Sequence, residues 1–513
     1  MIGLTLVLLG SVTAVIGLYV YLNSPQFNQR IRDFVIRETA AYTGSQVSLG
    51  SIRWDLRGQR VVLEDLTLRG TEAASEPPLG HIESITAGVR LRNLLQSHLD
   101  LSELEIVNPQ FRLRVDSEGR TNLPVPVKQR EVPESFKMSI DSLKVTGGQA
   151  IINDRKINID FDIKDLVAAL NYSGEAQKLS AQIAYTGILA NPGQFSIPYV
   201  LSSEFDFTMG TVVAHKISLT SGKSSANLQG KIERALTPEV AVKLDYSGNF
   251  ENAFLKHFMP KETIGGNSNT RGVLEYSSGK FSATGQIASK TVEFEGWKTD
   301  SLNANYTYRY PEKQLNLTKL AVAALGGTAK GTVSLIPVPG KPRITVDLNY
   351  SDVDTVQLAQ VYPWDRKYMI YSKAQGHLQG WLERDLTRYE FEGDSLLTSY
   401  TPEPMPGVIA FPASGPVTFA IKPGEMQVKS ADLHVLGTTV QASGRIVGKE
   451  SDLTISLASS NLEDLKFLYP DANGKGSFKG TLKGPLEKPA LEGDVVLDGY
   501  KYRDLTIQHA EGS

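Results

Sequence analysis

The chain has 513 residues, 41% hydrophobic and 21% charged, and its net charge of −3 gives no electrostatic reason to expect a nucleic-acid partner. Cysteine is absent, which excludes disulfides and thiolate metal sites. The length suffices for about three ordinary domains or for one extended array, so the pattern along the chain must decide the architecture.

The first 24 residues are predicted to be an uncleaved membrane anchor. Met1 to Leu22 carries no charged side chain, and a helix of about 20 apolar residues crosses the roughly 30 Å hydrocarbon core of a bilayer. A cleaved signal peptide is the alternative, but the sequence before Ser24 lacks the basic start and the small-residue cleavage site that it needs. The residues expected to lie in the membrane are Ile2, Leu4, Val7, Val15, Leu18 and Leu22.

The orientation of the anchor rests on weaker signals. Arg30, Arg32 and Arg37 follow the span, and the positive-inside rule taken alone would place this side in the cytoplasm. Long domains translocate largely regardless of flanking charge, and Asp33 and Glu38 lie among these arginines. We therefore expect the bulk of the chain outside the cytoplasm.

Residues 25–44 are predicted to form an amphipathic helix directly after the anchor. Ser24 is a typical N-cap, Pro25 fits the first helical turn, and apolar residues recur at helical spacing until Gly44 ends the pattern. Two interpretations remain open. The helix is either a juxtamembrane plug or membrane-surface segment, or it packs its apolar face on the first strands.

From residue 45 onward the period of the pattern changes to two, which is typical of strands with one apolar face. A first β segment is expected over residues 45–125, and a proline-bracketed linker over 126–138. Three β repeats and a partial fourth are expected to follow, over 139–235, 236–340, 341–446 and 447–513.

Each later repeat has an alternating strand followed by a short apolar helical stretch that closes at a proline. Read from Val242 to Val346 to Ile455, the spacing is 104 and then 109 residues. Self-similarity at a fixed period predicts a stacked, quasi-one-dimensional architecture. The last repeat opens new strands without a polar cap, so we expect the chain to be part of a longer protein. The helical stretches are 250–260, 353–363 and 462–470.

The apolar positions of these strands are the candidate groove residues. They share one face of a period-two strand, and could line either an open trough or the closed core of a sandwich. Polar neighbours such as Lys243, Asp347 and Thr454 are expected to face water. The candidates are Val240, Val242, Leu244, Tyr246, Ile344, Val346, Leu348, Tyr350, Leu453, Ile455 and Leu457.

No catalytic or metal-binding pattern is found in the sequence. The seven histidines show no H-x-H or H-E-x-x-H spacing, and neither a G-x-S-x-G elbow nor a cysteine nucleophile is present. Asp160 and Asp162 alternate with apolar residues and are expected on the wet face of a strand. The sequence therefore predicts no enzyme activity, no cofactor and no metal site.

Four stretches carry a family resemblance. They are the apolar span with Ser24 and Pro25, the run from Leu94 to Pro109, the segment from Asp116 to Pro124, and the motif from Gly480 to Gly493. Together they resemble the AsmA-like superfamily, in particular the TamB-type proteins of the diderm bacterial envelope. The resemblance implies an elongated β-groove with an apolar interior, anchored in the inner membrane and crossing the periplasm. It also implies phospholipids as cargo and, for the TamB type, an outer-membrane β-barrel partner of the TamA or BamA kind.

We therefore expect a mostly β protein in which a transmembrane helix precedes an elongated, repetitive, β-taco-like groove with short interspersed helices. Its expected function is to conduct phospholipids between the inner and outer membranes and so to support outer-membrane biogenesis. The alternative is a scaffold or chaperone for outer-membrane barrel assembly and protein secretion, which would act by pairing with strand edges.

Overall fold

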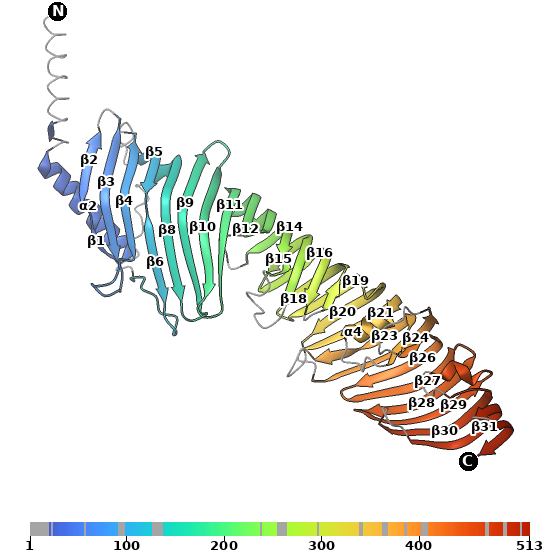
Figure 1. Cartoon of the computed structure of the whole chain (residues 1–513). Helices are drawn as coiled ribbons and strands as arrows, with labels where there is room; N and C mark the ends of the chain where they lie inside the picture. Colours follow the sequence, from blue (N-terminus) through green and yellow to red (C-terminus); the bar gives the residue numbers. More distant parts are fainter. Residues whose placement is uncertain are drawn as a thin grey trace, which may run out of the picture. The chain divides into compact units, whose positions relative to one another are not determined.

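The computed structural model is built almost entirely from β-strands, which Figure 1 shows in chain order. Among the residues that it describes, no helix is long and apolar enough to cross a membrane. The predicted anchor residues Ile2, Leu4, Val7, Val15, Leu18 and Leu22 lie outside the described part of the chain. That part consists of residues 20–21, 24–55, 58–90, 98–125, 137–235, 237, 239–253, 264–294, 297–337, 342–361, 368–383, 387–401, 409–466, 471–485, 490–502 and 505–513.

Helix α2 (Pro25–Thr43) lies where the sequence predicts a helix. The Ser24 hydroxyl accepts a hydrogen bond from the Phe27 backbone N–H at 3.2 Å, which satisfies one of the free donors of the first turn. At the other end Gly44 adopts a left-handed conformation with φ of 71°, and its N–H donates to the Ala40 carbonyl at 2.8 Å. Local sequence signals therefore fix both ends of this helix.

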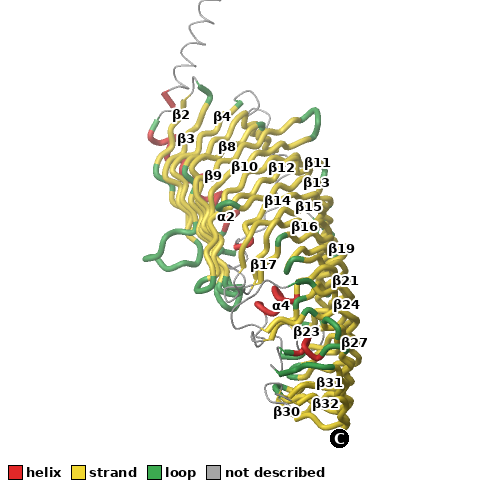
Figure 2. Tube along the Cα trace, turned by 45° about the vertical axis from the view of Figure 1, so that its right-hand side comes forward, coloured by secondary structure: helices red, strands yellow, loops and turns green. Residues whose placement is uncertain are grey.

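The described residues divide into two units. The first reaches Asn249, and the second contains Phe250–Ala253 and the described residues from 264 onward. Figure 2 shows consecutive strands of each unit side by side, with helices confined to short stretches.

The first unit is a sheet whose strands largely follow chain order. Strands β1 and β2 both pair with β3, and from β8 to β14 each strand pairs antiparallel with the next. Strands β5 and β6 instead pair parallel with β8. The strands are β1 (Gln46–Ser48), β2 (Ser51–Asp55), β3 (Arg60–Arg69), β4 (Gly80–Val89), β5 (His98–Val107), β6 (Gln110–Val115), β7 (Lys137–Ile140), β8 (Ser142–Asp154), β9 (Ile159–Ser173), β10 (Lys178–Asn191), β11 (Phe195–Thr208), β12 (Thr211–Ser221), β13 (Ser224–Glu233) and β14 (Ala241–Glu251).

The second unit continues the antiparallel pattern and adds two helical turns and a short side sheet. In the side sheet, β22 and β25 pair parallel to each other. The elements are β15 (Ile264–Ser277), β16 (Lys280–Phe294), β17 (Trp297–Thr299), β18 (Ser301–Tyr310), β19 (Gln314–Ala324), β20 (Gly327–Ile336), β21 (Arg343–Asp354), α4 (Thr355–Val361), β22 (Tyr368–Ile370), β23 (Ser372–Glu383), β24 (Tyr389–Ser399), β25 (Ile409–Phe411), β26 (Ala413–Lys422), β27 (Glu425–Val435), β28 (Thr438–Val447), β29 (Glu450–Ser459), η2 (Leu462–Leu465), β30 (Lys475–Pro485), β31 (Ala490–Tyr502) and β32 (Leu505–Gly512).

The repeat corresponds to six main strands followed by a helical turn. Going from β21 to β29, the sheet passes through β23, β24, β26, β27 and β28, so β21 and β29 run in the same direction. Each of the two is followed by a helical turn, α4 and η2, at the predicted places. Most of the predicted stretch 250–260 lies outside the described residues.

A glycine faces a leucine at the same place in three repeats. Gly230 pairs with Leu244, Gly331 with Leu348 and Gly444 with Leu453. A Cβ atom on any of these glycines would collide with the carbonyl oxygen of the residue before its leucine. The paired leucines are 104 and 105 residues apart, so the leucine opposite a glycine marks the repeat more regularly than the apolar pattern does.

Candidate functional site

The pairing register of the first unit brings apolar residues from eleven strands into one row. Residues directly opposite each other in a sheet share a face, so a row can be followed from strand to strand. Ten steps of about 4.8 Å make this row roughly 48 Å long. Its members are Trp54, Val61, Ala87, Leu104, Leu143, Leu170, Ala181, Phe205, Ala214, Gly230 and Leu244.

A second row runs beside the first on the same face. Its one polar member is Ser203, which is buried and donates a hydrogen bond from Oγ to the Ile183 carbonyl at 3.3 Å. The two rows together form a continuous apolar band. The second row is Ile52, Leu63, Ile85, Ile106, Val145, Ala168, Ile183, Ser203, Ile217, Leu228 and Tyr246.

The second unit carries a row of the same kind in which leucines are interspersed with glycines. A Cβ atom on Gly393 would lie 2.8 Å from Cζ of Phe419, so the phenylalanine ring covers the glycine on the neighbouring strand. Every member of the row is apolar or glycine. They are Leu320, Gly331, Leu348, Leu378, Gly393, Phe419, Val428, Gly444, Leu453, Leu482 and Leu491.

Ten of the eleven predicted groove residues lie on these apolar faces. Leu348 and Leu453 belong to one row of the second unit, and Leu244 ends a row of the first. Val240 precedes β14 and has no position in a row. The ten are Val242, Leu244 and Tyr246 in β14, Ile344, Val346, Leu348 and Tyr350 in β21, and Leu453, Ile455 and Leu457 in β29.

The apolar faces are half-buried and not closed. Only Leu453 among the ten is buried, at 9% exposed, and the others keep intermediate exposure. The inner residues of a sandwich would be shielded by the second sheet. In the described chain the two clusters of buried apolar residues are small, and they lie under α2 and beside α4. The exposures therefore favour an open trough over a closed sandwich.

The opposite face is polar and paired within itself. Lys144 and Glu105 lie directly across β8 and β5, with Nζ 3.5 Å from the carboxylate. Asp162, which the sequence predicts on the wet face, forms an ion pair with Lys164 at 3.1 Å. Of the named polar neighbours, Lys243, Asp347 and Thr454 are exposed. The sheet thus separates an apolar surface from a solvated one.

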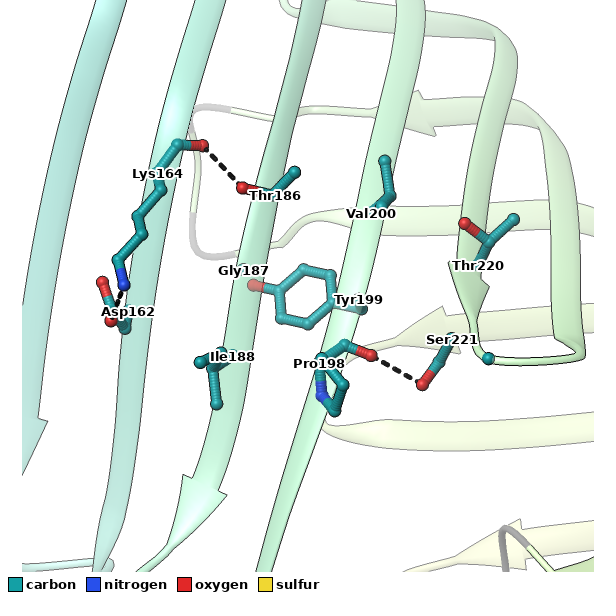
Figure 3. A pocket seen from close by; sticks show the side chains of 11 residues that line it. Asp162, Lys164, Thr186, Gly187, Ile188, Pro198, Tyr199, Val200, Thr220 and Ser221 are labelled. Atoms are coloured by element: carbon teal, nitrogen blue, oxygen red, sulfur yellow. Dashed lines mark hydrogen bonds and ion pairs between the residues drawn. The ribbon is translucent and has the colours of Figure 1, made fainter.

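A depression of about 450 Å³ lies over β9–β12 (Figure 3). Thr186, Ile188, Pro198 and Val200 reach it from the polar face, and the ring of Tyr199 lies across Gly187. Two of its hydroxyls are engaged by backbone carbonyls. The Thr186 hydroxyl donates to the Lys164 carbonyl at 3.3 Å and the Ser221 hydroxyl donates to the Pro198 carbonyl at 2.6 Å.

Helix α2 covers the start of the apolar band. It contributes Ile31, Val35 and Ile36 to the cluster around the buried residues Leu49, Ile52 and Leu66. The same cluster includes Trp54, Val61, Leu63 and Ile85, which are the first members of the two rows. The structure agrees with one of the two interpretations of this helix, because its apolar residues pack on the first strands.

A second cover lies beside β21 and is held by buried polar groups. Asp354, 8% exposed, accepts hydrogen bonds from the Val356 N–H and from Lys373 Nζ, both at 2.9 Å. The Tyr400 hydroxyl donates to the same carboxylate at 3.2 Å. Burial, reinforced by the Asp354 charge, raises the pKa of Tyr400 to about 12, so the phenol stays a donor. These groups tie α4 to β23 and to the end of β24.

Among the described residues, no three histidine, aspartate or glutamate side chains gather as they would to hold a metal ion. His215 contacts Asp206 and His377 contacts Asp347, each at 2.8 Å. These are single cross-strand pairs. The arrangement that repeats along the molecule is the apolar face.

The sequence was compared with models of protein families. The model described as the AsmA family matches residues 1–323, more than half of the chain. The chain belongs to the AsmA family. Neither the curated proteins nor the solved structures gave a match. The matched part of this AsmA-family chain includes the whole first unit and the strands that open the second.

The predicted groove residues cover three strands of the apolar face in this AsmA-family protein, although period-two alternation indicates strands from residue 45 onward. β8 to β13 also carry alternating patterns, and their apolar residues continue the rows that end at Leu244. The signal was present as period-two alternation, but bulges interrupt it, as between Ala214 and Ile217. Pairing across such bulges is a tertiary property that one strand does not reveal.

Proposed function

We propose that this AsmA-family chain conducts phospholipid acyl chains along the apolar face of its sheet, between the inner and outer membranes of a diderm envelope. The observation that carries the proposal is the row of apolar residues across eleven strands, most of which keep intermediate exposure. An acyl chain of about 16 methylenes gains on the order of 10 kcal/mol by leaving water. A continuous apolar surface removes that cost without reaction chemistry, so we propose a conduit and not an enzyme.

We also propose a cellular setting for the chain. Residues 1–24 would anchor the chain in the inner membrane, and the sheet would lie in the periplasm. Movement along the trough would be guided diffusion, with direction supplied by a partner or by a difference between the membranes. A TamB-type role in outer-membrane biogenesis, with a TamA- or BamA-type barrel as partner, is the narrower form of the same proposal.

The test is lipid capture by the full chain and by variants with a charge in the trough. Mass spectrometry of co-purified lipid should find phospholipid with the parent protein. Leu348→Asp should lose most of it, because a carboxylate on this face opposes an acyl chain. Asn349→Asp is the matched control, since Asn349 is the next residue of β21 and is exposed on the other face. It should keep its lipid.

Leu244→Asp and Ser247→Asp form the equivalent pair in β14 of the first unit. Circular dichroism must show that all four variants keep their strands. If the folded trough variants retain as much lipid as the controls, the apolar face is not the conduit and the proposal is wrong.

A further inference from the structure

The seam between α2 and strands β1–β3 lies where the apolar rows of the first unit begin. Ile52 and Leu63 open the second row, and both belong to the cluster that α2 covers. The helix fills this place with Ile31, Val35 and Ile36. Its own side chains therefore occupy the stretch of the face that an acyl chain would need at this end.

The helix holds that position with shallow packing. No residue of α2 is buried, in contrast to Val356 of α4, which is 8% exposed. Lipid methylenes could replace the contacts of Ile31, Val35 and Ile36 like for like, since both are apolar groups against the same surface. Gly44, with its left-handed φ of 71°, joins the helix to the sheet and gives the backbone a place to turn.

Shielded polar atoms without partners lie at the two ends of this seam, with Asn28 and Trp54 near the start of the helix and Ser45 beyond its end. Trp54 Nε1, Ser45 Oγ and Asn28 Oδ1 are shielded from solvent and have no hydrogen-bond partner within the described residues. Ser45 is 5% exposed, and the ring of Trp54 lies 5.7 Å from that of Phe27 on the helix. A shielded donor or acceptor without a partner destabilises the protein. The seam therefore has polar groups that a bound molecule could satisfy.

We propose that this seam is the loading site of the apolar face and that its ligand is a glycerophospholipid. In this scheme α2 lifts from β1–β3 and the acyl chains take the places of Ile31, Val35 and Ile36. An ester oxygen of the lipid accepts a hydrogen bond from Trp54 Nε1–H. The inference rests on the proposed function and adds where the lipid enters and which group recognises it.

The test locks the helix reversibly. Because the natural chain has no cysteine, Phe27→Cys with Trp54→Cys can be joined by a short bis-methanethiosulfonate and released by reductant, so each sample is its own control. p-Benzoylphenylalanine in place of Phe205, far along the first row, reports arriving lipid after illumination. The full chain is used in vesicles of phosphatidylethanolamine and phosphatidylglycerol. We expect the lipid adduct at position 205 to fall at least tenfold when locked and to return on reduction.

One control variant and two possible outcomes decide how the result is interpreted. Arg53→Cys with Val62→Cys, a cross-strand pair on the polar side of β2 and β3, receives the same reagent without holding the helix and should leave the adduct unchanged. An undiminished adduct in the locked protein would mean that lipid enters elsewhere, and would overturn the loading site while leaving the conduit intact. An adduct absent both from the crosslinked variant in its two states and from the parent chain carrying only the probe at position 205 would overturn the conduit and, with it, the loading site.

The recognition step has its own variant. Trp54→Phe keeps a ring and removes the Nε1 donor, and we expect three- to tenfold less adduct at position 205 in the unlocked protein. An adduct equal to that of the parent would remove Trp54 from the recognition step. Circular dichroism of the variant provides the check on folding.

Discussion

Two of the described helices cover strands, and they do so in opposite ways. α2 lies on β1–β3 with no buried residue and leaves three shielded polar atoms at its seam without partners. α4 is tied to β21–β24 by a buried carboxylate that receives an amide, an ammonium and a phenol. Both helices follow similar apolar sequence patterns. The polar residues beside them decide whether a cover can lift or is fixed.

The units also build their apolar faces differently. All three rows consist mainly of branched and aromatic side chains, but the small residues of the first-unit rows are mostly alanine, whereas the second-unit row has glycine at three of eleven places. Glycine lets neighbouring backbones approach and leaves room for a large side chain, as Phe419 over Gly393 shows. A surface of the same polarity can therefore come from two compositions, and the two should respond differently to substitution.

The largest expected effect comes from breaking the fixed cover. Asp354→Ala should lower the free energy of unfolding of the second unit by about 3 kcal/mol, because it leaves Lys373 and the Tyr400 hydroxyl without their acceptor. Urea unfolding followed by hydrogen exchange of β21–β24 measures the loss. Asp347→Ala, at a side chain 62% exposed in the same strand, should cost less than about 0.5 kcal/mol. Equal losses would show that the buried network adds nothing.

The next largest effect is expected from substituting a glycine in the second unit. Gly331→Ala forces a methyl group against the Asp347 carbonyl oxygen, so we expect a loss of about 2–3 kcal/mol in the free energy of unfolding. Gly193→Ala is the control in the first unit, since its φ is 82° but no atom lies within 4 Å of the added Cβ. The strained turn alone should cost about 1 kcal/mol. A reversed order would contradict the close approach of β20 and β21.

Truncating one valine in each helix compares the covers directly. Val356→Ala should cost about 2 kcal/mol because the side chain is buried beside Met369 and Tyr371, whereas Val35→Ala should cost less than about 1 kcal/mol. Amide exchange in the parent protein should also be more than tenfold faster in α2 than in α4, since shallow packing permits local opening. Similar exchange in both helices would argue against a liftable α2.

The smallest expected effect is on acid stability. Hydrogen bonds from Ser180 and His215, with a smaller effect of Lys178, lower the pKa of Asp206 from 3.8 to about 2. A carboxylate with a lowered folded-state pKa contributes stability above its unfolded value and loses it as the pH falls through the folded one. The first unit should therefore lose this contribution between about pH 4 and pH 2. Asp206→Asn should flatten that part of the stability curve.

Asp354 should affect the acid stability of the second unit in the same direction as Asp206 affects that of the first unit. Burial raises its pKa, but the hydrogen bond from Lys373 and those from the Gln357 and Val356 amides lower it more, and the net pKa lies below the ordinary value. Its contribution should likewise be lost below about pH 4. If Asp354→Asn leaves the acid unfolding of the second unit unchanged, the carboxylate is not what holds α4.

Local signals in the sequence were sufficient for the elements. Ser24 and Gly44 mark the ends of α2 because capping depends on neighbouring residues only. Alternation in β14, β21 and β29 assigns the faces correctly, since the side-chain period of a strand is fixed. The apolar pattern also indicated the helical turns after β21 and β29.

The register of the repeats could not be obtained in this way. Alternation fits equally well after any shift of two residues, and the apolar pattern matches Leu457 to Leu244 and Leu348. In the structure Leu453 takes that place, because Gly444 lies opposite it. Likewise, the apolar pattern of α2 did not show which surface the helix packs on. No sequence pattern near α2 predicts the polar atoms without partners at its seam.

The order of strand pairing also bears on how the protein is made. From β8 to β14, and again from β15 onward, nearly every main strand pairs with its predecessor in the chain. A hairpin closes in about 1–10 μs, whereas a ribosome delivers about 5–20 residues per second. Each strand thus has ample time to join the edge before the following one emerges. The sheet can grow during synthesis by repeated hairpin closure, with little need for segments not yet made.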